Sequence, residues 1–288
     1  MHPYILALIF GVVEGLTEFL PVSSTAHLRI CQSLLGIALD DGYWKMFAIV
    51  IQLGAILTLP IYFRERIAKF VATFPNGERG DRTIVTHPLT LTAIAFVCTA
   101  APAFLLTKVI GKHLESLVIM GSALVIGGVV MWVIDALYTR GVLATHTNHV
   151  EEMSLGQAVW IGLCQTLSAL FPGTSRSMST IASGQLAGMS RPAALEFSFF
   201  LSIPTMVVAT FYDLFRSVRP HQGEVAAIGH LTMTSQNWIA LAIGFVVSFI
   251  VAYGVVAWFM NWVRTRGFVP FAVYRIVVGL AVLWWAFK

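Results

Sequence analysis

The sequence predicts an all-α integral membrane protein with an inverted-topology repeat: six full transmembrane spans and two re-entrant helix-turn-helix hairpins that meet near the membrane midplane. Three observations support this fold class. Of the 288 residues, 57% are hydrophobic and 11% charged, and the mean hydropathy is +0.80, whereas soluble domains are about one quarter charged. Six apolar runs are long enough to cross a bilayer. Two shorter stretches contain polar residues and resemble each other.

The six long apolar runs are the predicted spans, because a transmembrane helix needs about 20 apolar residues. They cover residues 44–63, 89–108, 117–137, 195–214, 238–262 and 269–287. The formal charge is only +4, and most Lys and Arg residues lie in loops between these runs. This distribution is typical of membrane orientation and argues against a nucleic-acid partner. The three cysteines are far apart, so they predict neither a disulfide framework nor a metal motif.

Two predicted hairpins, residues 4–36 and 154–190, differ from the spans because each is interrupted by a proline, Pro21 or Pro172. A shift of 151 residues superimposes the two sequences without a gap. It places Gly11, Leu16, Pro21 and Ser24 on Gly162, Leu167, Pro172 and Ser175. The prolines are therefore the expected turning points of two related hairpins.

The chain divides into two repeats within one membrane domain, 1–288. The first repeat, 1–140, and the second, 151–288, each contain a hairpin followed by three spans. Three crossings invert the second repeat relative to the first, and inverted repeats with broken helices build their site near the midplane. Non-helical backbone at that depth is tolerated only where protein or a watery cavity surrounds it.

The basic residues predict the orientation. Loop 64–88 is rich in Lys and Arg, and placing it in the cytoplasm gives an excess of basic residues inside. Both termini then face outward. The first hairpin enters the membrane from the outer side and the second from the cytoplasm.

Two acids lie in the first hairpin, Glu14 and Glu18, four residues apart on one helix face. Two carboxylates inside a membrane repel each other and are costly to desolvate. A divalent cation, Mg²⁺ or Ca²⁺, bound between them would remove the repulsion between the two carboxylates, since such ions use one or two carboxylates together with substrate phosphates. The alternative is that the pair faces water or shares a proton.

Polar residues follow Pro21, namely Ser23, Ser24, Thr25 and His27. Their hydroxyls can bind phosphate oxygens, and a serine close to a histidine base is the usual arrangement of an activated nucleophile. We therefore predict Ser24 as the attacking oxygen and His27 as its base, with a metal-activated water as the alternative. The structural alternative is helix capping by the serines and a packed, neutral His27.

The second hairpin contains "PGTSRSMST", in which Ser175, Arg176 and Thr180 predict anion binding. A helix N-terminus favours phosphate, and an arginine fork can bind it bidentately. The alternative is a structural ion pair between Arg176 and Glu14 or Glu18. Elsewhere, Glu196 and Arg275 lie in spans and are expected to pair with each other or to line the cavity.

Acids on one hairpin and an arginine on the other favour phosphoanhydride cleavage, which requires charge neutralisation and a positioned oxygen. A different class of function is a transporter or flippase for an anionic lipid, because broken inverted repeats are also a transporter plan. A further class of lipid phosphatase has histidine and aspartate at fixed distances after its arginine. Here those positions are Ala182 and Leu186, which excludes that match.

Five segments resemble the bacterial undecaprenyl-diphosphate phosphatase, or bacitracin-resistance, family over nearly the whole chain. They are "EGLTEFLPVSSTAH", "PGTSRSMST", "FAIVIQLGAIL", "SRPAALEFSFFLSIP" and "FVPFAVYRIVVG". Ala26 and Met178 depart from the glycines common in the family, and the bulkier Met178 puts the fit of the second hairpin in question.

The resemblance implies an enzyme of the bacterial cytoplasmic membrane that hydrolyses a polyprenyl diphosphate with a divalent cation. Its site would open to the outer side, its product would re-enter cell-wall synthesis, and its activity would confer bacitracin resistance. It also implies the inverted-repeat fold and is compatible with a homodimer. The family's functional residues fall on Glu14, Glu18, Ser23, Ser24, Thr25, His27, Ser175, Arg176 and Thr180.

Overall fold

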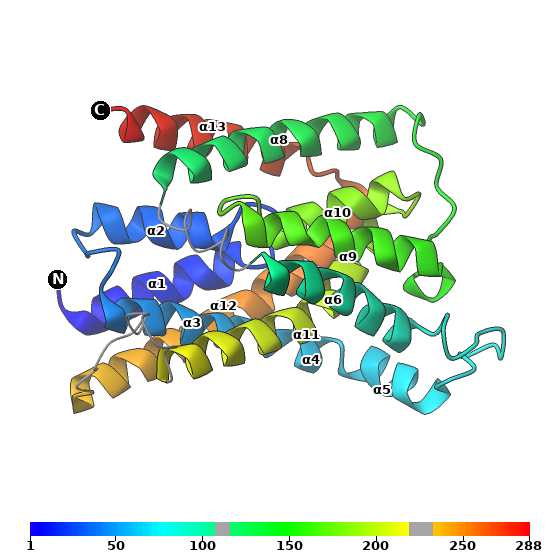
Figure 1. Ribbon diagram of the computed structural model, residues 1–288, viewed down its shortest axis with the longest axis horizontal. Coiled ribbons are helices and arrows are strands. Elements are labelled where there is room, and N and C mark those ends of the chain that lie inside the picture. Colours follow the sequence, from blue (N-terminus) through cyan, green and yellow to red (C-terminus); the bar gives the residue numbers. More distant parts are fainter. Residues whose placement is uncertain (107–115, 219–232) are drawn as a thin grey trace.

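The computed structural model describes residues 1–106, 116–218 and 233–288. This part of the chain is helical apart from turns, loops and one isolated bridge between Thr147 and Met189. Figure 1 shows long helices running side by side along the molecule, with both termini at the same end.

The helices of the first half are α1 (Pro3–Thr17), α2 (Ser24–Leu34), α3 (Gly42–Ile56), α4 (Thr58–Tyr62), α5 (Arg64–Thr73), α6 (Pro88–Leu105) and α8 (Leu117–Thr139). The second half contains the short η1 (Val150–Glu152), then α9 (Leu155–Leu170), α10 (Arg176–Leu186), α11 (Arg191–Val218), α12 (Ser235–Thr265) and α13 (Val269–Ala286).

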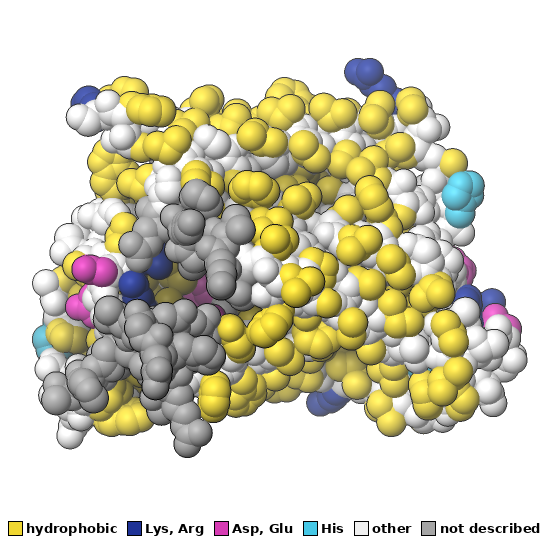
Figure 2. Space-filling view, viewed as in Figure 1, with side chains coloured by type: hydrophobic (Ala, Val, Ile, Leu, Met, Phe, Trp, Pro, Cys, Tyr) yellow, Lys and Arg dark blue, Asp and Glu magenta, His cyan; other side chains and the backbone are white. Residues whose placement is uncertain are grey.

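Six segments of the described chain are long and apolar enough to cross a membrane: α3 with α4, α6, α8, α11, α12 and α13. They correspond to the six predicted runs; the end of the run 89–108 lies outside the described residues. Hydrophobic side chains cover the middle of the face in Figure 2, and most charged side chains lie toward its two ends. The protein is therefore a multi-pass membrane protein. The helix α5 was not predicted, because its charged residues were assigned to a loop.

The two hairpins are α1 with α2 and α9 with α10, and each packs against a span from the other half. Helix α1 contacts α12, and α9 contacts α6. At Gly11 a Cβ would lie 2.8 Å from the Gly244 carbonyl oxygen, and at Gly162 it would lie 2.4 Å from that of Ala95. Only glycine lets the hairpin helix and the span lie this close in both places. Gly11 and Gly162, which are 151 positions apart, therefore have equivalent packing roles in the two hairpins.

Beyond the prolines, this equivalence changes by one residue. The N-cap of α2 is Ser23 and that of α10 is Ser175, and both have a positive φ, 74° and 71°. The second turn is one residue longer, with Gly173 at φ 97°. The gapless alignment of Ser24 with Ser175 is therefore wrong at this point: Ser24 and Arg176 are the equivalent first residues of α2 and α10.

Candidate active site

The turns of the two hairpins are held together by α13. Arg275 on this helix is fully buried, and its guanidinium donates to the carbonyl oxygens of Pro21 (3.0 Å), Gly173 (3.0 Å) and Ala123 (3.1 Å). It therefore ties one turn to the other and both to α8. The expected pairing of Arg275 with Glu196 is wrong, because Glu196 accepts a hydrogen bond from Arg66 Nε (2.9 Å).

A direct bond also joins the hairpins, from Ser177 Oγ to the carbonyl oxygen of Leu20 (2.9 Å). The two turns are thus fixed relative to each other by side chains that satisfy carbonyl groups left free where the helices stop. Buried carbonyls need such partners, because an unpaired one costs free energy. The first turns of α2 and α10 are thereby brought to the same place.

Glu18 bridges these two helix starts. Its Oε2 accepts a hydrogen bond from Ser24 Oγ (2.5 Å), and its Oε1 accepts one from Arg176 Nη2 (3.2 Å). The side chains of Glu18 and Arg176 are only 4% and 9% exposed. One carboxylate therefore holds the equivalent first residues of both second helices, Ser24 from one hairpin and Arg176 from the other.

Arg176 keeps donors to spare. Its Nε and Nη1 atoms are buried and have no hydrogen-bond partner among the described residues. Arg176 therefore forms the ion pair with Glu18 that was the structural alternative to anion binding. This pair uses only one of its three guanidinium nitrogens. The remaining donors, beside two helix N-termini, form a site suited to phosphate oxygens.

Glu14 lies one turn before Glu18 and is fully buried, and neither of its carboxylate oxygens has a partner among the described residues. A buried carboxylate in this state requires a proton or a cation. The described residues contain no group of three or more His, Cys, Asp or Glu side chains that could hold a metal. Glu14 and Glu18 nevertheless fit a Mg²⁺ or Ca²⁺ ion, because such ions commonly use two carboxylates and take the other oxygens from substrate and water.

His27 is oriented away from Ser24. Its Nδ1 lies 2.7 Å from the carbonyl oxygen of Ser23, so this nitrogen carries a proton, and its Nε2 lies 2.7 Å from Tyr274 Oη. In the neutral ring, Nε2 therefore accepts from the tyrosine hydroxyl. The hydroxyl of Ser24 is therefore hydrogen-bonded to the carboxylate of Glu18, whereas both ring nitrogens of His27 have other partners.

Tyr274 was missed by the sequence analysis, although it precedes Arg275 in "FAVYRIVVG". Two adjacent polar residues within an apolar span are a signal that could have identified both. The tyrosine ring also stacks on His27, with centroids 5.5 Å apart and planes 10° apart.

The remaining predicted residues have roles within the hairpins or lie at their surface. The hydroxyls of Ser23 and Ser175 cap α2 and α10 by accepting from the Ala26 and Met178 amides, each at 3.4 Å. Thr180 Oγ1 donates to the Arg176 carbonyl oxygen (3.0 Å) and lies 2.6 Å from Ser198 Oγ. Thr25 is exposed. Phosphate binding by these four residues stays a prediction.

Comparison with known proteins agrees with this arrangement. The family model described as "Bacitracin resistance protein BacA" matches residues 7–281. The chain belongs to the BacA family. The match begins within α1 and ends within α13 and covers every helix between them, so the bridged site lies within the matched part.

Relatives of the chain match along almost their full length. An undecaprenyl-diphosphatase of Koribacter versatilis is 70% identical over 289 residues, which is 100% of both chains. Proteins of the same name from Wolinella succinogenes and Caldanaerobacter subterraneus are 41% identical over 279 residues and 40% identical over 283 residues. These matches cover 97% and 98% of this chain, and 96% of each relative.

Proposed function

We propose that this protein hydrolyses undecaprenyl diphosphate to undecaprenyl phosphate and inorganic phosphate, recycling the lipid carrier of cell-wall synthesis and thereby conferring bacitracin resistance. The observation that carries the proposal is Glu18, whose carboxylate holds the Ser24 hydroxyl (2.5 Å) and the Arg176 guanidinium (3.2 Å) at one point between two hairpins. Full-length relatives named undecaprenyl-diphosphatase support the choice of substrate.

The protein would act in the bacterial cytoplasmic membrane, with the hairpins re-entrant and the site open to the outer, periplasmic side. The helix α5 and the following loop lie at the end opposite to the two termini (Figure 1), and they carry Arg64, Arg66, Lys69, Arg79 and Arg82. The excess of basic residues at that end supports a cytoplasmic location for it.

In the proposed reaction, the free donors of Arg176 hold oxygens of the terminal phosphate. Glu18 accepts the proton of Ser24, whose oxygen attacks the terminal phosphorus as the bond to the bridging oxygen breaks. Undecaprenyl phosphate leaves. Water then attacks the phosphorus of the phosphoserine and breaks its bond to the Ser24 oxygen, which takes back the proton from Glu18, while both protons of the water leave with the inorganic phosphate as dihydrogen phosphate. Compensation of phosphate charge by positioned donors supplies most of the rate enhancement in reactions of this kind.

A divalent cation belongs to this proposal as a group that Glu14 and Glu18 would hold. When bound, it would neutralise phosphate charge. The unpartnered oxygens of Glu14 are the observation that supports such an ion.

The test is phosphate release from undecaprenyl diphosphate by the purified protein in detergent, with and without a chelator. We expect release that needs added Mg²⁺ or Ca²⁺ and that falls at least about a hundredfold in Glu18→Gln, because the proton acceptor is removed. A matched control is Glu65→Gln, an exposed acid on α5. An inactive wild-type protein that nevertheless moves the lipid between vesicle leaflets would favour the transporter instead.

A further inference from the structure

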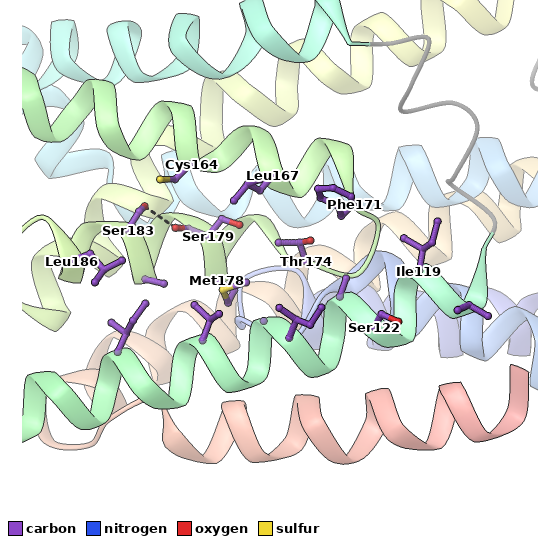
Figure 3. Close-up of a pocket in the computed structure, with 17 residues that line it drawn as sticks. Ile119, Ser122, Cys164, Leu167, Phe171, Thr174, Met178, Ser179, Ser183 and Leu186 are labelled. Carbon is purple, nitrogen blue, oxygen red and sulfur yellow. Dashed lines mark hydrogen bonds between the residues drawn. The ribbon is translucent and has the colours of Figure 1, made fainter. Parts of the chain in front are cut away.

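An apolar groove of about 540 Å³ lies between α8, α9 and α10, and its lining contains none of Glu18, Ser24 and Arg176. Figure 3 shows its side chains projecting into the space between α8 and the hairpin formed by α9 and α10. Its lining extends along α8 from Val118 to Ile134, which is about 24 Å at 1.5 Å per residue. The groove therefore follows most of the thickness of a bilayer core, about 30 Å.

The groove combines an open side with a deep floor. Its rim includes Ile126 (63% exposed) and Leu186 (47% exposed), whereas Met178 and Ala182 on its floor are each 5% exposed. A chain-like apolar molecule could therefore enter sideways from the lipid phase and lie against α10. The volume lies in the range of pockets that enclose small ligands.

The groove passes the turn of the second hairpin, close to the start of α10. Thr174, in the turn of the second hairpin, lines the groove and immediately precedes Ser175 and Arg176. A molecule whose head lies at Arg176 can thus place its tail in the groove.

We propose that this groove binds the isoprenoid chain of the substrate and fixes the direction from which its diphosphate reaches Arg176. The proposal rests on the proposed function and extends it to the lipid tail. Met178 is part of the floor and its Cε lies beside Gly127 of α8, where an added Cβ would be 2.8 Å away. The methionine that departs from the family pattern thereby sets the depth of the groove.

Binding can be tested without turnover in Glu18→Gln protein, so that failure of the proposed function does not affect the result. The probe is undecaprenyl diphosphate with a photoactivatable diazirine in its chain, and labelled peptides are identified by mass spectrometry. We expect labelling of α8, α9 and α10 that unlabelled undecaprenyl diphosphate suppresses. Labelling of other helices instead of α8, α9 and α10 would overturn the proposal. The proposal would also fail if a diazirine phospholipid labelled the groove equally well and unlabelled undecaprenyl diphosphate did not suppress that labelling.

A kinetic test uses Ile126→Trp, which fills the groove from its exposed rim, and Ile250→Trp on α12 as the control, since Ile250 is 61% exposed. We expect Ile126→Trp to lower kcat/KM for undecaprenyl diphosphate about tenfold, equivalent to about 1.4 kcal/mol, with little change for geranyl diphosphate. Ile250→Trp should change neither value. An unchanged ratio between the long and short substrates would contradict the proposal, and Val130→Phe serves as a second variant if Ile126→Trp does not fold.

Discussion

Ser24 Oγ lies 2.5 Å from Glu18 Oε2, so the serine proton has an acceptor already in place. We predict that Ser24→Ala lowers kcat for phosphate release by at least about a hundredfold, with only a small fall in melting temperature, because the lost bond to Glu18 costs about 1–3 kcal/mol. A control is Ser33→Ala at the other end of the same helix, which should retain activity. A phosphoserine trapped at Ser24 by acid quench would support the serine as nucleophile, whereas a largely active Ser24→Ala would assign the attack to water.

Tyr274 is predicted to act as a positioning residue for His27. The substitution Tyr274→Phe keeps the stacked ring but removes the hydroxyl that lies 2.7 Å from His27 Nε2. We expect kcat to fall about tenfold with KM almost unchanged, because loss of one hydrogen bond loosens the start of α2 that carries Ser24. Tyr253→Phe on α12 is the matched control. Equal effects of the two substitutions would show that His27 needs no orientation by Tyr274.

Which residues belong together could be predicted from the sequence, but not the direction in which each one points. Composition and spacing selected Glu18, Ser24 and Arg176, and the structure brings these three side chains into contact. Spacing also indicated His27 as the base, because it follows Ser24 by three residues. That inference is not supported, since His27 bonds back to the Ser23 carbonyl and across to Tyr274, which is 247 residues away in sequence. Local sequence does not contain a contact of that kind.

Between helices, Arg275 connects the two hairpin turns through its hydrogen bonds to the Pro21 and Gly173 carbonyl oxygens. We therefore predict the effect of replacing it. In Arg275→Lys the charge remains, but a single ammonium group cannot reach three carbonyls as a planar guanidinium does. Each buried carbonyl that loses its partner costs about 1–3 kcal/mol. We expect a lower melting temperature and an activity reduced at least about tenfold. Arg264→Lys at the exposed end of α12 should leave both unchanged; a stable, fully active Arg275→Lys would contradict this role.

A second connection joins α5, η1 and α11, where Arg66 pairs with Glu151 and Glu196. Burial alone would raise the pKa of Glu151, but the hydrogen bond and charge of Arg66 outweigh burial and lower it. A carboxylate with a lowered pKa stabilises the fold above its unfolded pKa, about 4.3, and loses this contribution as the pH falls.

This network predicts the pH dependence of stability. The side chains of Arg66 and Glu151 are 32% and 29% exposed, so Arg66→Gln should cost only about 1–2 kcal/mol at neutral pH. The difference in melting temperature between the wild type and Arg66→Gln should be largest near pH 7 and should shrink below about pH 4. Arg64→Gln, whose side chain is 75% exposed, is the control. A difference that does not depend on pH would rule out the carboxylates as its cause.

Hydropathy was sufficient to predict the six spans and their order, because apolar length decides whether a segment can cross a bilayer. It was not sufficient for the two turns, where a single additional residue, Gly173, moves Arg176 into register with Ser24. A gapless alignment cannot detect such a change. Helix α5 was missed for a related reason: its charged residues resemble those of a loop, and the bonds of Arg66 to distant acids are what fix its place.

Across the molecule, the paired contacts of the hairpins relate the two halves. Helix α1 packs on α12 as α9 packs on α6, and α8 packs on α13. Each hairpin is therefore held by a helix from the opposite half of the chain, and the bridge between Glu18, Ser24 and Arg176 draws on both halves. This arrangement also explains why acids and arginine need not occur at mirrored positions: each hairpin contributes one half of a shared site.

The orientation of the molecule in the membrane yields the last prediction. Both termini and the loop between α2 and α3 lie at one end, and the loop that follows α5 lies at the other (Figure 1). In protein whose three native cysteines are replaced by alanine, Asp40→Cys should react with a membrane-impermeant maleimide in cells whose outer membrane alone is permeable. Glu78→Cys should react only after the cytoplasmic membrane is broken, because the basic end is retained inside. Labelling in the reverse order would place the hairpin that carries Glu18 and Ser24 on the cytoplasmic side, and a substrate arriving from the periplasm could not reach it.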